Sequence, residues 1–327
     1  EAGVNHNGDL DMARQLVDAA VRTGADAVKF QTFKADRLLT PDAPKAEYQE
    51  TTGSVESQLE MIRSLELSPA AHNELMGYCQ DMGILFMSSP FDESSADLLD
   101  ELDVAVFKIP SGEITNLPFL SHVAGKGKPL IVSTGMAYLS EVEAAVRTIE
   151  AAENIYYVLL QCTSNYPADP ADANLAAMGT MATAFNVPVG YSDHTPGIEV
   201  PLAAVALGAC VVEKHLTLDR TLPRPDHLAS LEPDDFSSMV RGIRIVESAL
   251  GHGRKEPAAS EANTASVARK SLVAAKDIPA GATLTQDLIA IKRPGTGLPP
   301  AIRAYLAGRT ARRPIPEGTI LTLEMLE

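Results

Sequence analysis

Residues 189–215 read VGYSDHTPGIEVPLAAVALGACVVEKH, and this stretch decides the fold class of the chain. Two short apolar, β-branched runs at 189–192 and 210–214 flank a segment with helical spacing at 197–207. A strand–helix–strand order of this kind is typical of parallel βα units. Each strand runs into a histidine, His194 or His215, so the reactive groups of the stretch lie at the carboxyl ends of its strands.

The same alternation extends over the first 250 residues. Further strands are predicted at 27–31, 84–88, 104–109, 130–133 and 156–161, and residues 1–3 are expected to end an eighth strand. Helical patterns lie at 10–23, 69–82, 94–102, 140–152, 175–185 and 234–250. Eight βα units predict an α/β fold of the (β/α)8 TIM-barrel type. An open doubly wound sheet is the alternative, but the glycine-rich phosphate turn that usually follows its first strand is not in the sequence.

The composition changes after residue 250. Residues 251–268 are rich in Gly, Ala, Ser, Pro and charge, which is typical of a linker. Residues 269–327 contain an approximate repeat, DIPAGATLTQDLI at 277–289 and PIPEGTILTLEML at 314–326, in which a Pro-x-Gly turn precedes a short strand. The sequence therefore predicts a barrel over 1–250, a linker over 251–268 and a small β-rich domain over 269–327.

Charge and cysteine content restrict the possible partners and the compartment. A formal net charge of −16 argues against nucleic acid and anionic membranes, because both require a basic surface. The longest apolar run, 200–212, has 13 residues and is too short to span a bilayer. Cys79, Cys162 and Cys210 are far apart and set among apolar residues, so we expect buried, reduced thiols in a cytoplasmic protein.

Polar side chains follow every predicted strand. In chain order they are Glu1; Lys29 and Gln31; Ser88 and Ser89; Lys108, Ser111 and Glu113; Ser133 and Thr134; Thr163, Ser164 and Asn165; Ser192, Asp193 and His194; Glu213, Lys214 and His215. Any one of them could be an ordinary loop residue. Because the carboxyl ends of barrel strands meet at one mouth, together they predict a single ring-shaped site there.

Two groups within this ring suggest chemistry. His194 and His215 end neighbouring strands, so both imidazoles could hold one metal ion and leave positions for water and substrate; the alternative is two capping or core histidines. Fixed positive charge from Lys29 and Lys108, with nearby serine hydroxyls, suits a phosphate and a carboxylate. A buried lysine, Lys108 or Lys214, could instead form a Schiff base as in aldolases.

A series of motifs now identifies a resemblance. They are EAGVNHNGD at 1–9, KFQTF at 29–33, SSPFD at 88–92, KIPSGE at 108–113, STGM at 133–136, CTSNYP at 162–167, GYSDHT at 190–195, EKH at 213–215 and PDHLASL at 225–231. In this order they resemble the bacterial N-acetylneuraminate (sialic acid) synthase family, which includes the legionaminic and pseudaminic acid synthases. The motif KRPGTGL at 292–298 and the C-terminal repeat are similar to that family's antifreeze-like SAF domain.

The resemblance implies an activity and a set of site residues. The enzyme would condense phosphoenolpyruvate with an N-acylated mannosamine-like sugar, giving a nine-carbon 2-keto acid and phosphate by C–O cleavage. The divalent metal on His194 and His215 would be Mn2+, with Mg2+ or Co2+ as alternatives. Implied substrate-binding residues are Lys29, Gln31, Ser89, Ser111, Ser133, Ser164, Tyr166, Ser192, Asp226 and Arg293. Implied catalytic residues are Glu1, Lys108 and Glu113.

The resemblance also implies a domain-swapped homodimer, in which Arg293 of one subunit reaches the barrel of its partner. Three residues depart from the family pattern, namely Arg224 where relatives have glycine, Leu216, and Ser164 where some relatives have asparagine. Arg224 implies a different local geometry or charge near Asp226, and the other two departures leave the identity of the sugar open. A Schiff-base aldolase, a keto-acid synthase acting on a phosphorylated sugar, and a non-enzymatic carbohydrate- or ice-binding protein are the alternative functions.

Overall fold

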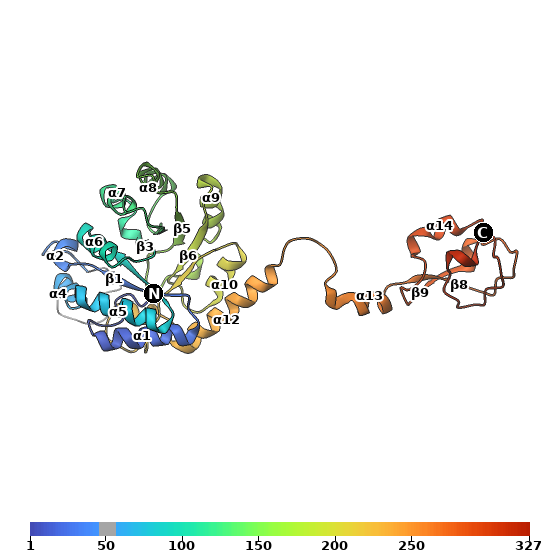
Figure 1. The fold of residues 1–327 in the computed structure, drawn as a ribbon, viewed down its shortest axis with the longest axis horizontal. Coiled ribbons are helices and arrows are strands. Elements are labelled where there is room, and N and C mark those ends of the chain that lie inside the picture. Colours follow the sequence, from blue (N-terminus) through green and yellow to red (C-terminus); the bar gives the residue numbers. More distant parts are fainter. Residues whose placement is uncertain (46–56) are drawn as a thin grey trace. The chain divides into compact units, whose positions relative to one another are not determined.

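The computed structural model describes residues 1–45 and 57–327. These residues form two compact units, Glu1–Gly251 and His252–Glu327. Figure 1 shows the first unit as strands surrounded by helices, with the N-terminus at the level of the strands. Each unit has its own hydrophobic core.

Seven parallel strands form the inner wall of the first unit. They are β1 (Ala27–Thr32), β2 (Leu85–Pro90), β3 (Phe107–Ile109), β4 (Leu130–Ser133), β5 (Tyr157–Cys162), β6 (Val189–Asp193) and β7 (Val212–Lys214). One ladder joins β1 to β2, a second runs in order from β3 to β7, and β2 lies next to β3.

Residues 1–3 occupy the eighth position of the wall. The Ala2 amide donates to the Lys29 carbonyl in β1 (2.9 Å), and the Leu216 amide just after β7 donates to the Glu1 carbonyl (2.8 Å). Gly3 and Phe30 form a parallel bridge. The N-terminal segment therefore closes the ring between the last and first strands, which confirms the predicted (β/α)8 barrel.

Helices cover the outside of this wall. They are α1 (Leu10–Thr23), α2 (Ala35–Leu38), α4 (Gln58–Arg63), α5 (Pro69–Met82), α6 (Glu93–Glu101), α7 (Leu117–Ala124), α8 (Leu139–Ala151), α9 (Ala176–Phe185), α10 (Glu199–Ala206), α11 (Pro225–Ala229) and α12 (Pro233–Leu250). Local chemistry fixes their ends. At α1, Asp9 accepts hydrogen bonds from the first-turn amides of Asp11 and Met12, and Gly24 ends the helix in the left-handed conformation.

The predicted strand 104–109 is too long at its start. Asp103 has a positive φ of 58°, and the Val104 amide bonds to the Leu99 carbonyl at the end of α6. These residues finish the helix, so only Phe107–Ile109 pair as a strand. Among the described residues no helix is both long and apolar enough to cross a membrane.

The second unit is β-rich, as predicted from its repeat. Strands β8 (Ser271–Ala274) and β9 (Ile289–Lys292) pair antiparallel. Ile278 and Ile315 stand at equivalent places in the two repeats and exchange backbone hydrogen bonds (2.8 and 2.9 Å). The repeats therefore pair with each other around one small core. The range predicted as a linker contains the 3-10 turn Ala259–Glu261 and helix α13 (Ala262–Ala268).

Gly190 in β6 gives a test of barrel packing. A Cβ at this position would lie 2.4 Å from the Val211 carbonyl oxygen and 2.6 Å from Leu160 Cδ2. Gly190→Ala should therefore lower the free energy of unfolding by about 2 kcal/mol through overpacking. Gly179→Ala is the matched control, because a methyl group added to Gly179 in α9 would meet no other atom within 4 Å. Chemical denaturation should show the control unchanged or more stable, and equal midpoints for both variants would contradict the packing argument.

Candidate active site

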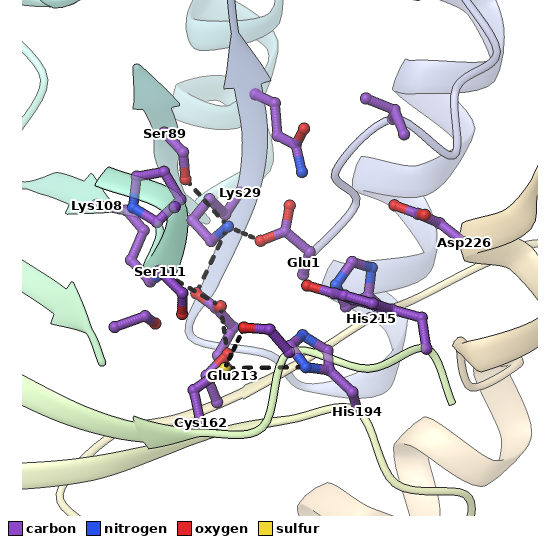
Figure 2. A pocket seen from close by; sticks show the side chains of 18 of the residues that line it. Glu1, Lys29, Ser89, Lys108, Ser111, Cys162, His194, Glu213, His215 and Asp226 are labelled. Atoms are coloured by element: carbon purple, nitrogen blue, oxygen red, sulfur yellow. Dashed lines mark hydrogen bonds and ion pairs between the residues drawn. The ribbon is translucent and has the colours of Figure 1, made fainter. Parts of the chain in front are cut away.

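A cavity of about 410 Å³ opens at the carboxyl ends of the barrel strands. Most residues predicted for the site line it. They are Glu1, Lys29, Gln31, Ser89, Lys108, Ser111, Ser133, Ser164, Tyr166, Ser192, His194, His215 and Asp226. Figure 2 shows side chains from several strands pointing into this one space.

Two buried lysines face two buried carboxylates in the floor of the cavity. Lys29 Nζ contacts the Glu1 carboxylate, lies 3.5 Å from Glu213 Oε2, and donates to Ser89 Oγ at 3.3 Å. Lys108 Nζ lies 3.4 Å from Glu213 Oε1. Glu213 thus stands between the two ammonium groups, and Ser192 Oγ donates to it at 2.8 Å.

Burial and charge oppose each other in this cluster. Burial lowers the pKa of Lys29 to about 7, although the charge of Glu213 acts to raise it. Burial raises the pKa of Glu213, but the two lysine charges outweigh it and hold that pKa well below the ordinary value. An ionised Glu213 therefore favours the charged form of Lys29 and lies within ion-pair distance of Lys108.

The two predicted metal-binding histidines lie side by side. Their ring centroids are 5.3 Å apart, and Tyr166 lies over both rings at 4.0 and 5.6 Å. His194 Nδ1 bonds to the Thr163 carbonyl at 2.8 Å. Because a carbonyl only accepts, Nδ1 carries the hydrogen, and in the neutral form of the ring Nε2 has a lone pair.

His215 and Glu1 each keep a buried atom without a hydrogen-bond partner. These atoms are His215 Nδ1 and Glu1 Oε1. Burial, and then the charge of His194, keep the pKa of His215 well below its ordinary value, so this ring stays neutral and able to ligate. Across residues 1–45 and 57–327 no three His, Cys, Asp or Glu side chains form a complete metal-binding group. The donor set fits an ion held by two imidazoles with other positions open.

The cavity lining also combines one further acid with an apolar wall. Burial raises the pKa of Asp226 to about 6, against the charge of His194. Asp226 can therefore accept or donate a hydrogen bond near neutral pH. The apolar wall consists of Val4, Met61, Ile62, Leu65 and Phe91.

Some predicted residues are not brought into the cavity. The Glu113 carboxylate accepts a hydrogen bond from Asn116 Nδ2 at 2.7 Å and is not among the lining residues. Arg293 is an exposed residue of the second unit. Lys214, one of the two lysines considered for a Schiff base, is fully buried and donates to Asp193 Oδ2 at 2.6 Å outside the cavity lining.

Among the described lining residues, two with ionisable side chains were not predicted as site residues. Glu213 was recognised only as a polar strand end, although it stands two residues before His215, and this spacing puts both on the same face of a strand. Cys162 is buried, as expected, and its sulfur also lies 3.9 Å from His194 Nδ1 at the cavity wall. Cys210 was also expected to be buried and is exposed, so that prediction was wrong.

The fold and this site define a class of protein, a TIM barrel with two buried lysines and two adjacent histidines at its mouth. The model of the NeuB family matches residues 16–255, a model of the SAF domain matches residues 269–327, and the chain belongs to the NeuB family.

Named relatives agree with this assignment. The chain is 48% identical to the N,N'-diacetyllegionaminic acid synthase of Legionella pneumophila, over 100% of this chain and 93% of that one. It is 39% identical to the N-acetylneuraminate-9-phosphate synthase of Mus musculus, over 100% and 91%. The crystal structure of the N-acetylneuraminic acid synthetase of Leptospira borgpetersenii superposes with a TM-score of 0.71 at 36% identity, over 80% of this chain and 87% of that one.

Proposed function

We propose that this protein condenses phosphoenolpyruvate with an N-acylated amino sugar, giving a nine-carbon 2-keto acid and phosphate. The observation that carries the proposal is the cavity in which Lys29, Lys108 and Glu213 adjoin the His194–His215 pair. The condensation of a trianionic substrate with an aldehyde would require positive charge for the anion next to a metal ion for the aldehyde. Family membership supports the same reaction.

The lysines and serines would hold the phosphate and carboxylate of phosphoenolpyruvate. Lys29 and Lys108 supply charge, and Ser111, Ser133 and Ser192 supply short donors. Ser133 Oγ is buried without a partner, so it has hydrogen-bonding capacity for a ligand. These groups are fixed before binding, which reduces the reorganisation needed as charge moves.

The chemistry forms two bonds and breaks one. Carbon 3 of phosphoenolpyruvate attacks the sugar aldehyde carbon, whose oxygen ends as a hydroxyl after taking up a proton, and water adds to the carbon 2 cation. The bond from carbon 2 to the phosphate oxygen then breaks with its electron pair leaving on phosphate, and the new hydroxyl on carbon 2 gives its proton to phosphate and becomes the keto group. A divalent ion on His194 and His215, for which we propose Mn2+ with Mg2+ or Co2+ as alternatives, would supply Lewis-acid polarisation of the aldehyde.

A carboxylate must accept a proton from the attacking water. Glu1 Oε1 has no hydrogen-bond partner and lines the cavity, whereas Glu113 does not line it. We therefore assign the base to Glu1, and the catalytic role of Glu113 stays a prediction.

The apolar wall of the cavity supports a particular kind of sugar as the substrate. Its apolar side chains can pack against a methyl group and acyl groups, while Asp226, Tyr166 and Ser164 can bind the polar groups of a sugar. Among the described residues of this chain that line the cavity, the only lysine or arginine side chains are Lys29 and Lys108, so a second phosphate would depend on a cation from the partner subunit. A 2,4-diacetamido-2,4,6-trideoxyhexose is therefore the best-supported substrate, followed by N-acetylmannosamine.

The test is a product analysis. The enzyme, Mn2+ and phosphoenolpyruvate labelled with 18O at the bridging oxygen are incubated with each of these sugars and with N-acetylmannosamine 6-phosphate. We expect a nine-carbon keto acid from the diacetamido sugar and the label in phosphate. Label retained in the keto acid would rule out C–O cleavage, and absence of a product with every sugar would refute the function. A pyruvate adduct trapped by borohydride would favour the aldolase.

We also propose that the protein acts as a domain-swapped homodimer, in which Arg293 serves the barrel of the partner subunit. Arg293→Ala should then lower turnover at least tenfold while the melting temperature of the barrel is retained. Mixing this variant with Lys108→Ala, and exchanging subunits, should restore part of the activity, because some sites regain both residues. If the two variants stayed inactive after mixing, that result would contradict an active site formed by residues of both subunits.

The cytoplasm is the proposed compartment. Cys79, Cys162 and Cys210 are not joined to one another by disulfides, which supports a reducing environment.

A further inference from the structure

The backbone of Arg224 has an unusual conformation. Its φ and ψ are 111° and 147°. The other described non-glycine residues with positive φ lie between 45° and 63°, in the left-handed helical region that side chains tolerate. Arg224 instead adopts a conformation that is natural for glycine, and such strain persists only where other contacts hold it.

The side chain of Arg224 makes one such contact across the mouth of the barrel. Its Nη2 donates to Ser64 Oγ at 2.9 Å, and the Ser64 hydroxyl donates to the Met61 carbonyl at 2.7 Å. The backbone of Ser64 packs closely against Gly8, because a Cβ added to Gly8 would lie 2.3 Å from the Ser64 carbonyl oxygen. Arg224 therefore links α11 to the end of α4.

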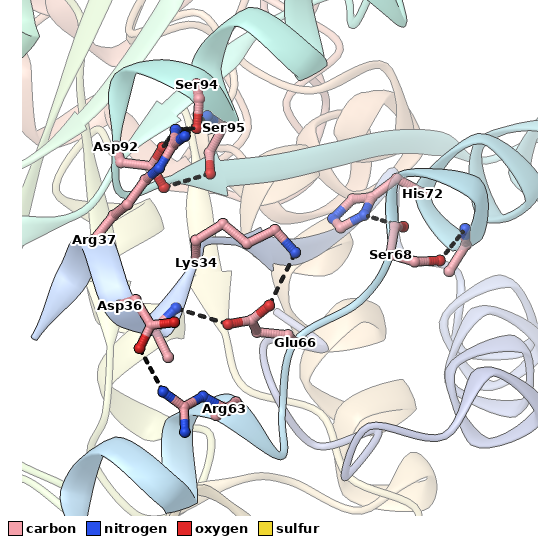
Figure 3. A network of polar contacts seen from close by, with 12 residues as sticks. Lys34, Asp36, Arg37, Arg63, Glu66, Ser68, His72, Asp92, Ser94 and Ser95 are labelled. Atoms are coloured by element: carbon pink, nitrogen blue, oxygen red, sulfur yellow. Dashed lines mark hydrogen bonds and ion pairs between the residues drawn. The ribbon is translucent and has the colours of Figure 1, made fainter.

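The α4 segment is also tied to α2. Glu66 accepts from Lys34 Nζ at 2.9 Å and from the Ala35 amide at 2.8 Å, and Arg63 pairs with Asp36. Figure 3 shows these contacts on the side of the segment that faces α2. The Arg224 contact adds a connection to a different element, α11, so the segment is held between two parts of the barrel mouth.

α11 is held at its start and at its centre. Beyond Arg224, His227 bonds through Nδ1 to Thr217 Oγ1 (2.6 Å) and through its other ring nitrogen to Asn7 Oδ1 (3.2 Å). Asp226 lies between these two anchors and lines the cavity. The position of its carboxylate therefore depends on both.

We propose that Arg224 is a positioning residue that sets the spacing between Asp226 and the apolar wall of α4, and so controls how well the sugar binds. Met61, Ile62 and Leu65 form the α4 part of that wall. Loss of the Arg224 contact would leave these two sides of the cavity to be ordered by the sugar itself, which weakens its apparent affinity. The lysines and serines proposed to bind phosphoenolpyruvate lie on or next to the barrel strands, so their positions would be unaffected. This inference rests on the proposed function.

The test compares Arg224→Ala with Arg224→Gly. Both variants lack the guanidinium, but only alanine keeps the strained Cβ. Arg224→Gly should therefore melt roughly 2–4 °C above Arg224→Ala. The KM for the sugar should rise about fivefold or more in Arg224→Ala and less in Arg224→Gly, with little change in kcat or in the KM for phosphoenolpyruvate. Arg224→Lys should recover part of the sugar affinity.

Two further variants complete the test. Ser64→Ala should raise the sugar KM in the same direction, and the double variant with Arg224→Ala should be no worse than Arg224→Ala alone. Arg147→Ala, which removes an exposed arginine paired with Glu143 on α8, is the control and should change neither constant. Two results would overturn the role of Arg224 and leave the proposed function intact. One is a sugar KM that stays at the wild-type value in Arg224→Ala, and the other is a sugar KM that rises by the same factor as the KM for phosphoenolpyruvate. A wild-type enzyme that converts no sugar would instead overturn the proposed function, and this role with it.

Discussion

Replacing His215 with alanine should lower turnover by a factor on the order of 10³, because polarisation of an aldehyde by a metal is worth several kcal/mol in the transition state. His215 Nδ1 is buried and lacks a hydrogen-bond partner, and its ring lies 5.3 Å from that of His194. An unpaired buried nitrogen costs free energy unless a ligand satisfies it. Removing metal from the wild-type enzyme with a chelator should have an effect of similar size, reversed by Mn2+.

Thermal melting separates loss of the metal from loss of the fold. Mn2+ should raise the melting temperature of the wild-type protein and leave that of His215→Ala unchanged, because only the wild type binds the ion tightly. His122→Ala is the matched control, since His122 is partly exposed on α7 and bonds to Asp97 at 2.7 Å. This control should keep both its activity and its response to Mn2+. Undiminished turnover by the chelated wild-type enzyme would refute the role of the ion.

The barrel could be predicted because its sequence signals are local and repeated. Each strand combines a short apolar run with a polar end, so the β1 and β6 regions were identified to within a residue at each end. The start of β3 was missed because Val104 looks like a strand residue, yet it forms the backbone bond that ends α6. That competition depends on the turn at Asp103, which apolar periodicity does not reveal.

The site could be predicted as a set of residue types, and less well as a geometry. His215 and Glu213 share a strand face, so the alternation of side chains along a strand would have been enough to identify Glu213, although it was not predicted as a site residue. Glu113 follows β3 within the 3-10 turn Ser111–Glu113, where that alternation no longer holds. Ser111 lines the cavity while Glu113 bonds to Asn116. The unpartnered atoms and the strain at Arg224 are properties of the three-dimensional packing, and no sequence pattern indicates them.

Replacing Lys108 with methionine should lower kcat/KM for phosphoenolpyruvate about 10³-fold, since removing one preorganised group that stabilises charge in the transition state costs about 10²–10³ in rate. In the unliganded cavity Lys29 and Lys108 balance the carboxylates of Glu1 and Glu213. Without Lys108, Glu213 keeps a single lysine, and a strongly anionic substrate must enter a site with excess negative charge. Lys126→Met is the control, because Lys126 bonds to Asp97 away from the cavity and its loss should leave kcat/KM unchanged.

Glu213→Gln distinguishes this charge balance from a specific contact of Lys108 with substrate. If balance dominates, Lys108→Met combined with Glu213→Gln should bind phosphoenolpyruvate better than Lys108→Met alone, because the double variant removes the uncompensated carboxylate. Direct binding measured by calorimetry would report this independently of turnover. A double variant as weak as Lys108→Met would show that the ammonium group acts mainly through its own contact with the phosphate or carboxylate. In that case Glu213 would serve to keep Lys29 charged before the substrate arrives, since its carboxylate lies 3.5 Å from the Lys29 ammonium group.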